Sequence, residues 1–330
     1  MIEKAVGILG VGSFVPDKVV TNHELEKVID TSDQWIVERT GIRERRIVEP
    51  GQATSDLATK AAERALQDAG VSAEEIDLII VGTVTPDMFF PSVACLVQEN
   101  LKAHKAAAFD LTAVCSGFIY GLITGSAFIK TGTYKKILVI GAETLSTITD
   151  WNDRNTAILF GDGAGAVVLG ETEPGYGILG TNLGAEGAGG DLLKVPAGGS
   201  RQPITEELIN NKLHYIHMDG NEVFKFAIKV MGETVNKALA EAKLAASDVT
   251  CLVPHQANLR IIQSAAKRLG LPMEKVIVNV DKYGNTSAAS IPIALDEGIK
   301  SNRIKNGDVI ALVGFGGGLT WGSCVLRWLK

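Results

Sequence analysis

The chain has 330 residues, 46% of them hydrophobic and 21% charged, which is typical of a globular protein with two domains or one core built from two similar halves. Its formal net charge of −6 gives little electrostatic support to nucleic-acid binding, so we expect no nucleic-acid partner. No run of 18 apolar residues indicates a membrane span, and the N-terminal segment lacks the pattern of a secretory signal. A cytoplasmic protein is the simplest expectation.

The four cysteines lie far apart, at Cys95, Cys115, Cys251 and Cys324. None of the close pair spacings of a zinc site is present, so no metal centre is expected. A chain of this length does not need disulfides to fold, and we expect reduced thiols.

Short apolar runs alternate with helical patterns along the first half of the chain. Residues 55–69 place apolar side chains on one helical face, which predicts a helix. The runs 77–83, 106–111 and 136–141 predict buried strands, and a helix is expected from Ser116 to about Lys130. This alternation predicts an α/β fold with helices packed on a sheet.

The chain also repeats itself. A constant offset of 173 pairs Ala65-Leu66 with Ala238-Leu239, and the same offset pairs further residues up to position 314. A single offset that holds this far indicates duplication. We therefore predict two similar halves, residues 1–172 and 173–330, with a site where they meet.

Cys115 stands where the predicted strand gives way to the predicted helix. Free cysteine is often a buried core residue, and that interpretation stays open on the local sequence alone. In the functional interpretation, the unpaired amide groups and the positive end of the helix dipole lower the pKa of the Cys115 thiol.

Two residues of the second half are candidate partners of Cys115. His255 follows the strand that the repeat pairs with residues 77–81, and strand ends of this kind carry ligands in open α/β sheets. Asn285 precedes a helix of small residues. A structural histidine and a helix-capping asparagine are the alternatives.

Two glycine-rich stretches invite a nucleotide-binding interpretation. Residues 161–170 continue into a strand pattern, where a dinucleotide fingerprint requires a helix. Residues 314–322 are expected to form a loop between strands at 309–313 and 323–328. A tight glycine loop of this kind can direct backbone N–H groups at an oxyanion.

Several motifs in order give the chain a resemblance to the β-ketoacyl-[acyl-carrier-protein] synthase III family of the thiolase superfamily over essentially its whole length. They are Gly-Ile-Arg-Glu-Arg (41–45), Thr-Pro-Asp (85–87), Phe-Pro-Ser (90–92), Ala-Val-Cys-Ser-Gly-Phe (113–118), Phe-Gly-Asp-Gly-Ala-Gly-Ala (160–166), His-Gln-Ala-Asn-Leu-Arg (255–260), Tyr-Gly-Asn-Thr-Ser (283–287) and Gly-Phe-Gly-Gly-Gly (314–318). The resemblance implies a five-layered αβαβα fold made of two duplicated halves.

The resemblance further implies an acyltransferase with a Cys115–His255–Asn285 triad. Cys115 would accept an acyl group from acyl-coenzyme A, with acetyl-coenzyme A as the expected donor. The backbone N–H groups of Cys115 and Gly316 would form the oxyanion hole. Malonyl-acyl carrier protein would then lose carbon dioxide and condense with the acyl group, giving β-ketoacyl-acyl carrier protein in type II fatty-acid synthesis. No permanently bound cofactor is implied.

Other site residues are implied by resemblance alone. The coenzyme A and pantetheine path would be lined by Thr31, Trp35, Arg39, Arg154, Gly220, Asn221, Phe224, Ala257 and Asn258. Arg260 and Lys267 would dock the acidic carrier protein, and Phe90 would reach a primer pocket across a homodimer interface. A solvated helix face is the alternative for the Arg260–Lys267 pair.

Two other functions stay open on the sequence. A related acyltransferase of secondary metabolism would load Cys115 but use another acceptor. A non-catalytic acyl-binding homologue would be expected to lack a triad residue, whereas all three residues are present. The identity of the primer, whether acetyl, propionyl or branched, also stays open.

Overall fold

A computed structural model of the chain describes residues 4–330. The first sheet consists of β1 (Val6–Phe14), β4 (Leu78–Gly82), β5 (Ala107–Leu111), β6 (Ile137–Thr144) and β7 (Asp162–Glu171). The second sheet consists of β8 (Gly177–Ala185), β11 (Cys251–Pro254), β12 (Val309–Gly316) and β13 (Thr320–Arg327). The three strands predicted in the first half therefore form, and their ends differ from the predicted ones by at most three residues.

The two sheets share one strand order. The first runs β1-β7-β6-β4-β5 and the second runs β8-β13-β12-β11. Beyond β11, Val276 forms a parallel bridge to Leu252, at the place that β5 occupies beside β4. The expected duplication of the fold is thus visible in strand order and direction. The predicted boundary between residues 172 and 173 falls in the connection from β7 to β8, and as a domain boundary it stays a prediction.

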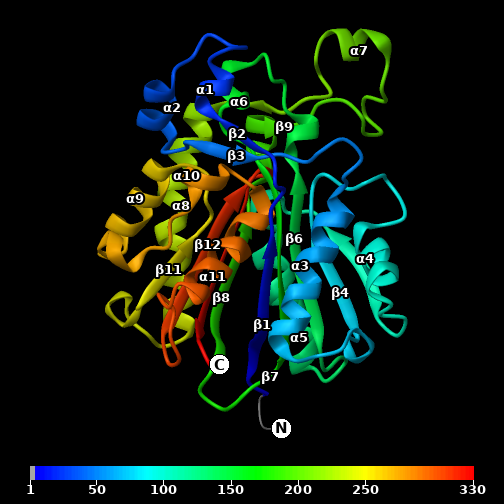
Figure 1. Ribbon diagram of the computed structural model, residues 1–330. Helices are drawn as coiled ribbons and strands as arrows, with labels where there is room; N and C mark the ends of the chain where they lie inside the picture. Colours follow the sequence, from blue (N-terminus) through cyan, green and yellow to red (C-terminus); the bar gives the residue numbers. More distant parts are fainter. Residues whose placement is uncertain (1–3) are drawn as a thin grey trace.

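Helices occupy three layers around the two sheets (Figure 1). The outer face of the first sheet is covered by α3 (Thr54–Ala69) and α4 (Val93–Leu101). Between the sheets lie α5 (Gly117–Lys130) and α11 (Ser290–Lys300), which contact strands of both. The outer face of the second sheet is covered by α8 (Gly220–Glu241), with α9 (Leu259–Arg268) packed against it. The fold is the expected five-layered αβαβα arrangement.

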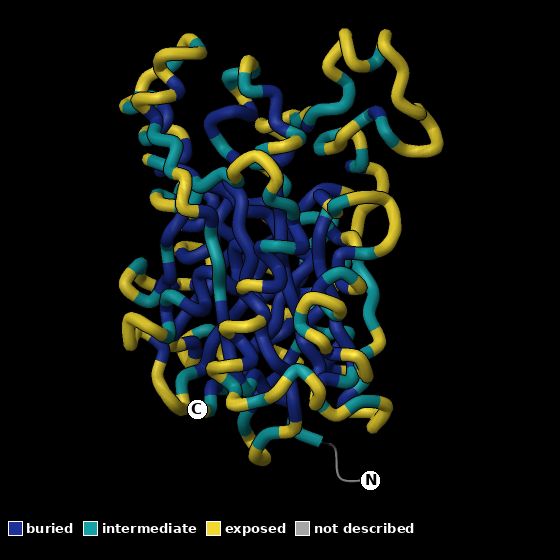
Figure 2. The backbone as a smooth tube through the Cα atoms, turned by 45° about the vertical axis from the view of Figure 1, so that its right-hand side comes forward, coloured by how far each residue is buried: buried dark blue, intermediate teal, exposed yellow. Residues whose placement is uncertain are grey.

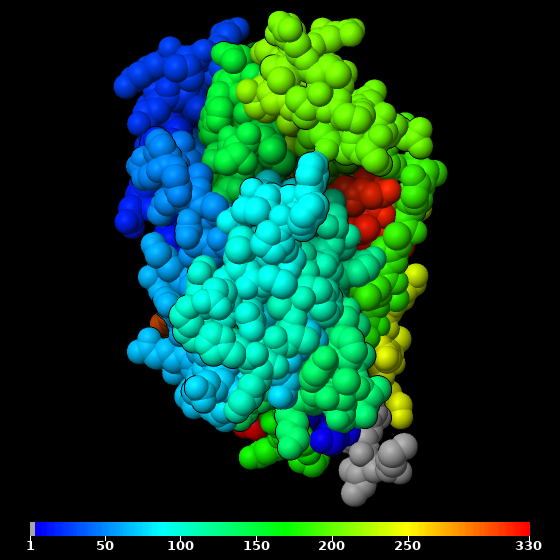
Figure 3. Space-filling view, turned by 90° about the vertical axis from the view of Figure 1, so that its right-hand side faces the viewer, coloured from blue at the N-terminus to red at the C-terminus, as the bar shows by residue number. Residues whose placement is uncertain are grey.

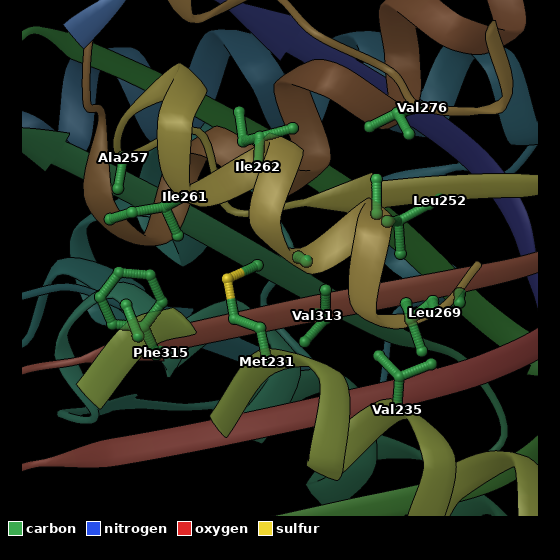
Figure 4. Packing of buried hydrophobic residues seen from close by; sticks show 14 of the residues in the cluster. Met231, Val235, Leu252, Ala257, Ile261, Ile262, Leu269, Val276, Val313 and Phe315 are labelled. Atoms are coloured by element: carbon green, nitrogen blue, oxygen red, sulfur yellow. The ribbon is translucent and has the colours of Figure 1, made fainter. Parts of the chain in front are cut away.

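The apolar core follows these layers in separate clusters of buried residues. Figure 4 shows the cluster outside the second sheet, where Val235 of α8 lies beside Leu269, the residue after α9, and Met231 of α8 lies near Val313 of β12. Burying side chains of this size stabilises the fold by about 1.5–3 kcal/mol each. Figure 2 shows the buried chain concentrated in the sheets and central helices.

The remaining elements gather at the end of the molecule that lies opposite the termini (Figure 1). They are α1 (Asn22–Leu25), α2 (Asp33–Thr40), α6 (Arg154–Ala157), α7 (Glu206–Asn210), α10 (Val280–Tyr283) and the short strand pairs β2 (Val19–Thr21) with β3 (Glu44–Arg46) and β9 (Leu193–Lys194) with β10 (His217–Met218). The strands β6 and β12 end there too, so this end is where an α/β protein of this kind places ligands. Within residues 4–330, no helix is long and apolar enough to cross a membrane.

Candidate active site

Cys115 lies in a tight turn between β5 and α5. The 3₁₀ turn η2 (Val114–Ser116) leads directly into the helix, and Val114 has a φ of 48°. A β-branched residue in this region of φ is strained, and such strain persists where the surrounding structure holds it. The turn places the Cys115 thiol at the N-terminal end of α5, as the sequence predicts, with only 5% of the residue exposed.

The end of β12 approaches the Cys115 turn with no space for a side chain. A Cβ atom on Gly316 would lie 2.6 Å from the backbone nitrogen of Cys115. Glycine is therefore required here for the strand from the second half to reach the turn from the first. The predicted glycine loop is much shorter than expected, because β12 and β13 form a hairpin that already includes Gly314 to Gly316 and extends from Thr320.

The expected lowering of the Cys115 pKa is wrong for the unliganded site. Burial is the main reason why the pKa of the thiol is raised to about 12; the nearby Glu143 carboxyl adds to this rise and the polar Ser287 side chain opposes it. Desolvation outweighs what the helix end contributes, because the buried thiolate has lost its hydration. The thiol is thus protonated at neutral pH and needs a proton acceptor when it reacts.

His255 follows the last residue of β11 and is buried. Its backbone N–H donates to the Val313 carbonyl at 2.7 Å, which ties it to β12. Its Nδ1 lies 2.6 Å from the Ser290 hydroxyl, which also accepts from the N–H of Gln256. A hydroxyl that accepts from Gln256 can donate its own proton to Nδ1, and in that tautomer Nε2 carries the N–H. Burial lowers the pKa of His255 to about 3, so the ring is neutral.

Asn285 is held in place by hydrogen bonds from its backbone N–H, its backbone carbonyl and its side-chain oxygen. Its N–H donates to the Leu159 carbonyl at 2.8 Å, and its carbonyl accepts from Gly161 at 3.1 Å. Its side-chain oxygen accepts from the N–H of Ser287 at 2.9 Å. Thr286 and Ala289 occupy the N-cap positions of the 3₁₀ turn at Ser287–Ala289 and of α11, so the helix-capping alternative for Asn285 is wrong. The engaged oxygen leaves the side-chain NH₂ of Asn285 available as a donor.

The candidate triad opens onto one cavity of about 290 Å³. Its wall includes Cys115, His255, Asn285 and Gly316, which come from both halves of the chain. Four residues of the expected pantetheine path also line it, namely Gly220, Phe224, Ala257 and Asn258. Of these, Asn258 also caps α9 and donates from its side chain to the Arg39 carbonyl.

The other expected coenzyme A residues lie outside the cavity wall. The guanidinium carbon of Arg154 is 3.9 Å from the centre of the Trp35 ring, and that of Arg39 is 4.9 Å away. The resemblance implies that Trp35 and Arg154 sandwich the adenine ring of coenzyme A. Because the two side chains are in direct contact here, that ring can enter only if Arg154 moves. The Thr31 hydroxyl is buried without a hydrogen-bond partner, whereas Asn221 is exposed at the start of α8.

The residues expected to contact partners lie on the surface. Arg260 and Lys267 are both exposed on α9, and the Arg260 guanidinium lies over the ring of Phe224 at 5.3 Å. Phe90 is 84% exposed and its neighbour Phe89 is 87% exposed. Figure 3 shows the face that the first half presents, with the segment around α7 projecting at its top and C-terminal residues visible in a recess. Large exposed aromatic rings are typical of an interaction surface.

Three residues beside the triad were missed by sequence reasoning. Ser290 orients His255, and Ser287 hydrogen bonds both to Asn285 and, at 3.0 Å, to the buried carboxylate of Glu143. No local motif identifies Glu143 as a site residue, since an acidic residue after an apolar run is typical of the end of a strand. The 173-residue offset does mark it, because it pairs Glu143 with Gly316.

The chain is similar to known proteins over nearly all of its length. Two family models match, "3-Oxoacyl-[acyl-carrier-protein (ACP)] synthase III" over residues 109–187 and its C-terminal counterpart over residues 239–328. The β-ketoacyl-[acyl-carrier-protein] synthase III of Desulfitobacterium hafniense is 59% identical over 99% of this chain and 98% of its own length. That of Caldanaerobacter subterraneus is 59% identical over the full length of both. The crystal structure of 3-oxoacyl-[acyl-carrier-protein] synthase III from Aquifex aeolicus superposes with a TM-score of 0.91 at 49% identity, covering 98% of this chain and 100% of that one.

The extent of these matches exceeds what a shared fold alone requires. The relatives align over nearly all of both chains, and the matched segments contain Cys115, His255, Asn285 and Gly316. The chain belongs to the β-ketoacyl-[acyl-carrier-protein] synthase III family and is an initiating condensing enzyme of fatty-acid synthesis.

Proposed function

We propose that the chain transfers an acyl group, acetyl in the simplest case, from acyl-coenzyme A to Cys115 and condenses it with malonyl-acyl carrier protein. The observation that carries this proposal is the convergence of Cys115, His255 and Asn285 on one cavity. The products are β-ketoacyl-acyl carrier protein, carbon dioxide and coenzyme A. These steps use acyl-coenzyme A as a substrate and call for no permanently bound cofactor.

In the first step, the Cys115 sulfur attacks the thioester carbonyl and coenzyme A leaves as its thiolate. The negative charge that develops on the carbonyl oxygen is stabilised by the backbone N–H groups of Cys115 and Gly316. The close approach of β12 to the Cys115 turn supports this role, because it brings the two amide groups together. The strained φ of Val114 supports it too, since it sets the direction of the next N–H.

In the second step, malonyl-acyl carrier protein loses carbon dioxide and leaves an enolate on the thioester oxygen. The neutral His255 ring and the Asn285 amide each offer an N–H to that oxygen. Ser290 supports this role by holding the Nδ1 side of His255, and Ser287 supports it by occupying the Asn285 oxygen. The enolate carbon then attacks acyl-Cys115 and the cysteine sulfur leaves.

The remaining contacts complete the proposal. Trp35 and Arg154 would hold the adenine ring of coenzyme A, supported by the position of the Arg154 guanidinium over the indole, and Arg39 would line the path of the phosphates and pantetheine. Arg260 and Lys267 would attract the acidic carrier protein to the cavity entrance. The exposure of Phe90 supports a homodimer in which this ring reaches the partner's primer pocket. A cytoplasmic location belongs to the same proposal.

Intact-protein mass spectrometry tests the proposal directly. Incubation with acetyl-, isobutyryl- and hexanoyl-coenzyme A should add an acyl mass that is lost in Cys115→Ser, and the preferred donor identifies the primer. Cys251→Ser is a matched control, since Cys251 is a buried thiol of β11, away from the cavity wall. Absence of an adduct with all three donors would contradict the proposal. An acylated enzyme that makes no β-ketoacyl product from malonyl-acyl carrier protein would instead favour another acceptor.

A further inference from the structure

Glu143 is a fully buried carboxylate at the end of β6, behind Cys115. One of its oxygens accepts from the Thr85 hydroxyl at 2.6 Å, from the Val84 N–H at 3.1 Å and from the Thr83 hydroxyl at 3.3 Å. The other accepts from the Ser287 hydroxyl at 3.0 Å. Within residues 4–330, Glu143 hydrogen bonds to no cationic side chain. A buried carboxylate without a counter-charge is costly and calls for an explanation.

Glu143 and Gly316 occupy equivalent positions in the two halves of the chain. Glu143 has a carboxylate side chain where Gly316 has none. The offset of 173 pairs Val114 with Ser287, which have φ values of 48° and 46° and begin the 3₁₀ turns η2 and η7 (Ser287–Ala289). Each turn packs on the end of the other half's strand, η2 on β12 and η7 on β6. At the end of β12, Gly316 lies beside Cys115. At the end of β6, Glu143 lies beside Ser287.

Ser287 joins this second turn to the reactive cysteine. Its hydroxyl donates to Glu143, and Ser287 shares a cavity wall with Cys115 where the turn η2 packs against the turn η7. A hydroxyl can donate one proton while it accepts another, so Ser287 can pass a proton from the Cys115 thiol to the Glu143 carboxylate. Glu143 itself is fully buried and is not part of the cavity wall.

The ionisation states fit proton movement along this path. Burial raises the pKa of Glu143 to about 7, whereas the pKa of His255 is lowered to about 3 and that of Cys115 is raised to about 12. A base is most effective when its pKa lies near the working pH. The groups that contact Glu143 are the Thr83 and Thr85 hydroxyls and the Val84 N–H, which follow β4, and the Ser287 hydroxyl of η7. On β7, the Asp162 carboxylate is engaged with Ser146 and Val48 instead. The charge of Glu143 raises the pKa of Cys115, so the two groups interact electrostatically.

We propose that Glu143 is a positioning residue that receives the Cys115 proton through Ser287 during acyl transfer and returns it after condensation. As the sulfur–carbon bond forms, the thiol proton passes to the Ser287 oxygen and the Ser287 proton passes to the carboxylate. Coenzyme A leaves as a thiolate and takes its proton from solvent. When the enolate displaces Cys115 as a thiolate, the carboxyl proton returns through Ser287. This inference rests on the proposed function and adds the proton's location in the acyl-enzyme.

Glu143→Gln tests the relay because the amide keeps the shape of the side chain but cannot accept a proton. The measurement is the single-turnover rate of Cys115 acylation by acetyl-coenzyme A between pH 5 and 9. In the wild type the rate should rise through an apparent pKa near 7 and level off. In Glu143→Gln it should fall at least about 100-fold at pH 8 and lose that titration. Ser287→Ala should show the same loss, and Glu143→Asp should keep the titration.

Other outcomes separate the relay from simpler explanations. If Glu143 only repels the thiolate, Glu143→Gln should acylate faster, and this result would overturn the relay. An unchanged rate and pH profile would overturn it as well. Asp162→Asn removes another buried carboxylate, from β7, and should keep the wild-type profile if the variant folds. A wild-type protein that is not acylated at any pH would refute the proposed function, whereas an acylated wild type with a normal Glu143→Gln refutes the relay alone.

Discussion

Replacing Gly316 by alanine should remove the oxyanion hole while leaving the fold in place. The added Cβ would lie 2.6 Å from the Cys115 nitrogen, 3.2 Å from the Val114 Cβ and 3.3 Å from the Cys115 Cα. Since such atoms normally stay about 3.5 Å apart, the strand and the turn must separate by roughly 1 Å. The neighbouring atoms are mostly backbone, so no side chain can rotate to relieve the contact.

The displacement should cost far more activity than stability. Loss of one well-placed oxyanion donor lowers a rate by about 10²–10³-fold, equivalent to about 2.7–4 kcal/mol of transition-state stabilisation. Overpacking of this size lowers the free energy of unfolding by about 1–3 kcal/mol, which a chain of this size can tolerate. The assay is single-turnover acylation by acetyl-coenzyme A, followed by intact mass, alongside thermal unfolding.

Gly314→Ala is the matched control. Gly314 lies on the same strand, where a Cβ would meet the flexible end of Ile291 at 3.2 Å and the Cys115 carbonyl at 3.4 Å. Small shifts relieve those contacts, so we expect an acylation rate within a few-fold of the wild type. A folded Gly316→Ala variant that acylates as fast as Gly314→Ala would refute the assignment of this amide to the oxyanion hole.

Three further predictions concern other parts of the site. Asn285→Ala should slow condensation with malonyl-acyl carrier protein by at least about 10-fold more than acyl loading, since one enolate hydrogen bond is worth about 1.5–3 kcal/mol; equal losses in the two half-reactions would contradict its role. Trp35→Ala should raise KM for acetyl-coenzyme A several-fold, about 1 kcal/mol, with kcat nearly unchanged in steady-state assays. His255 has a pKa of about 3 in the folded chain and about 6.5 unfolded, so the unfolded state binds its proton first as the pH falls. Denaturation curves should therefore show stability lost by up to about 1.4 kcal/mol per pH unit below 6.5, and His255→Gln should lack this contribution.

The sequence predicts most of the scaffold because its patterns are local. The helix α3 and the strands β4, β5 and β6 form within three residues of the predicted limits, since apolar periodicity and turn residues determine such elements directly. The offset of 173 also predicts the equivalence of the two sheets. Strand ends therefore give the approximate places of Cys115 and His255 before any contact is known.

The electrostatics of the site could not be predicted in the same way. The position of Cys115 at a helix end suggests a low pKa, whereas the thiol's burial by the second half raises it. Ser287 and Glu143 are 144 residues apart in the chain, and their contact follows only from the packing of η7 on β6. The glycine-rich stretch near 316 reads as a loop by composition, but pairing with β13 makes it a strand.

The two halves show how one duplicated framework yields a single reactive centre. Both strained turns survive in the fold, yet one carries Cys115 and the equivalent position in the other carries Ala288. The strand end facing each turn differs as well. In the proposed mechanism Gly316 offers its backbone N–H to an oxyanion, whereas the Glu143 carboxylate at the other turn would repel one. An acyl thioester would therefore be stabilised at the first turn only, and the second turn would serve to position Asn285 and Ser287 beside the first.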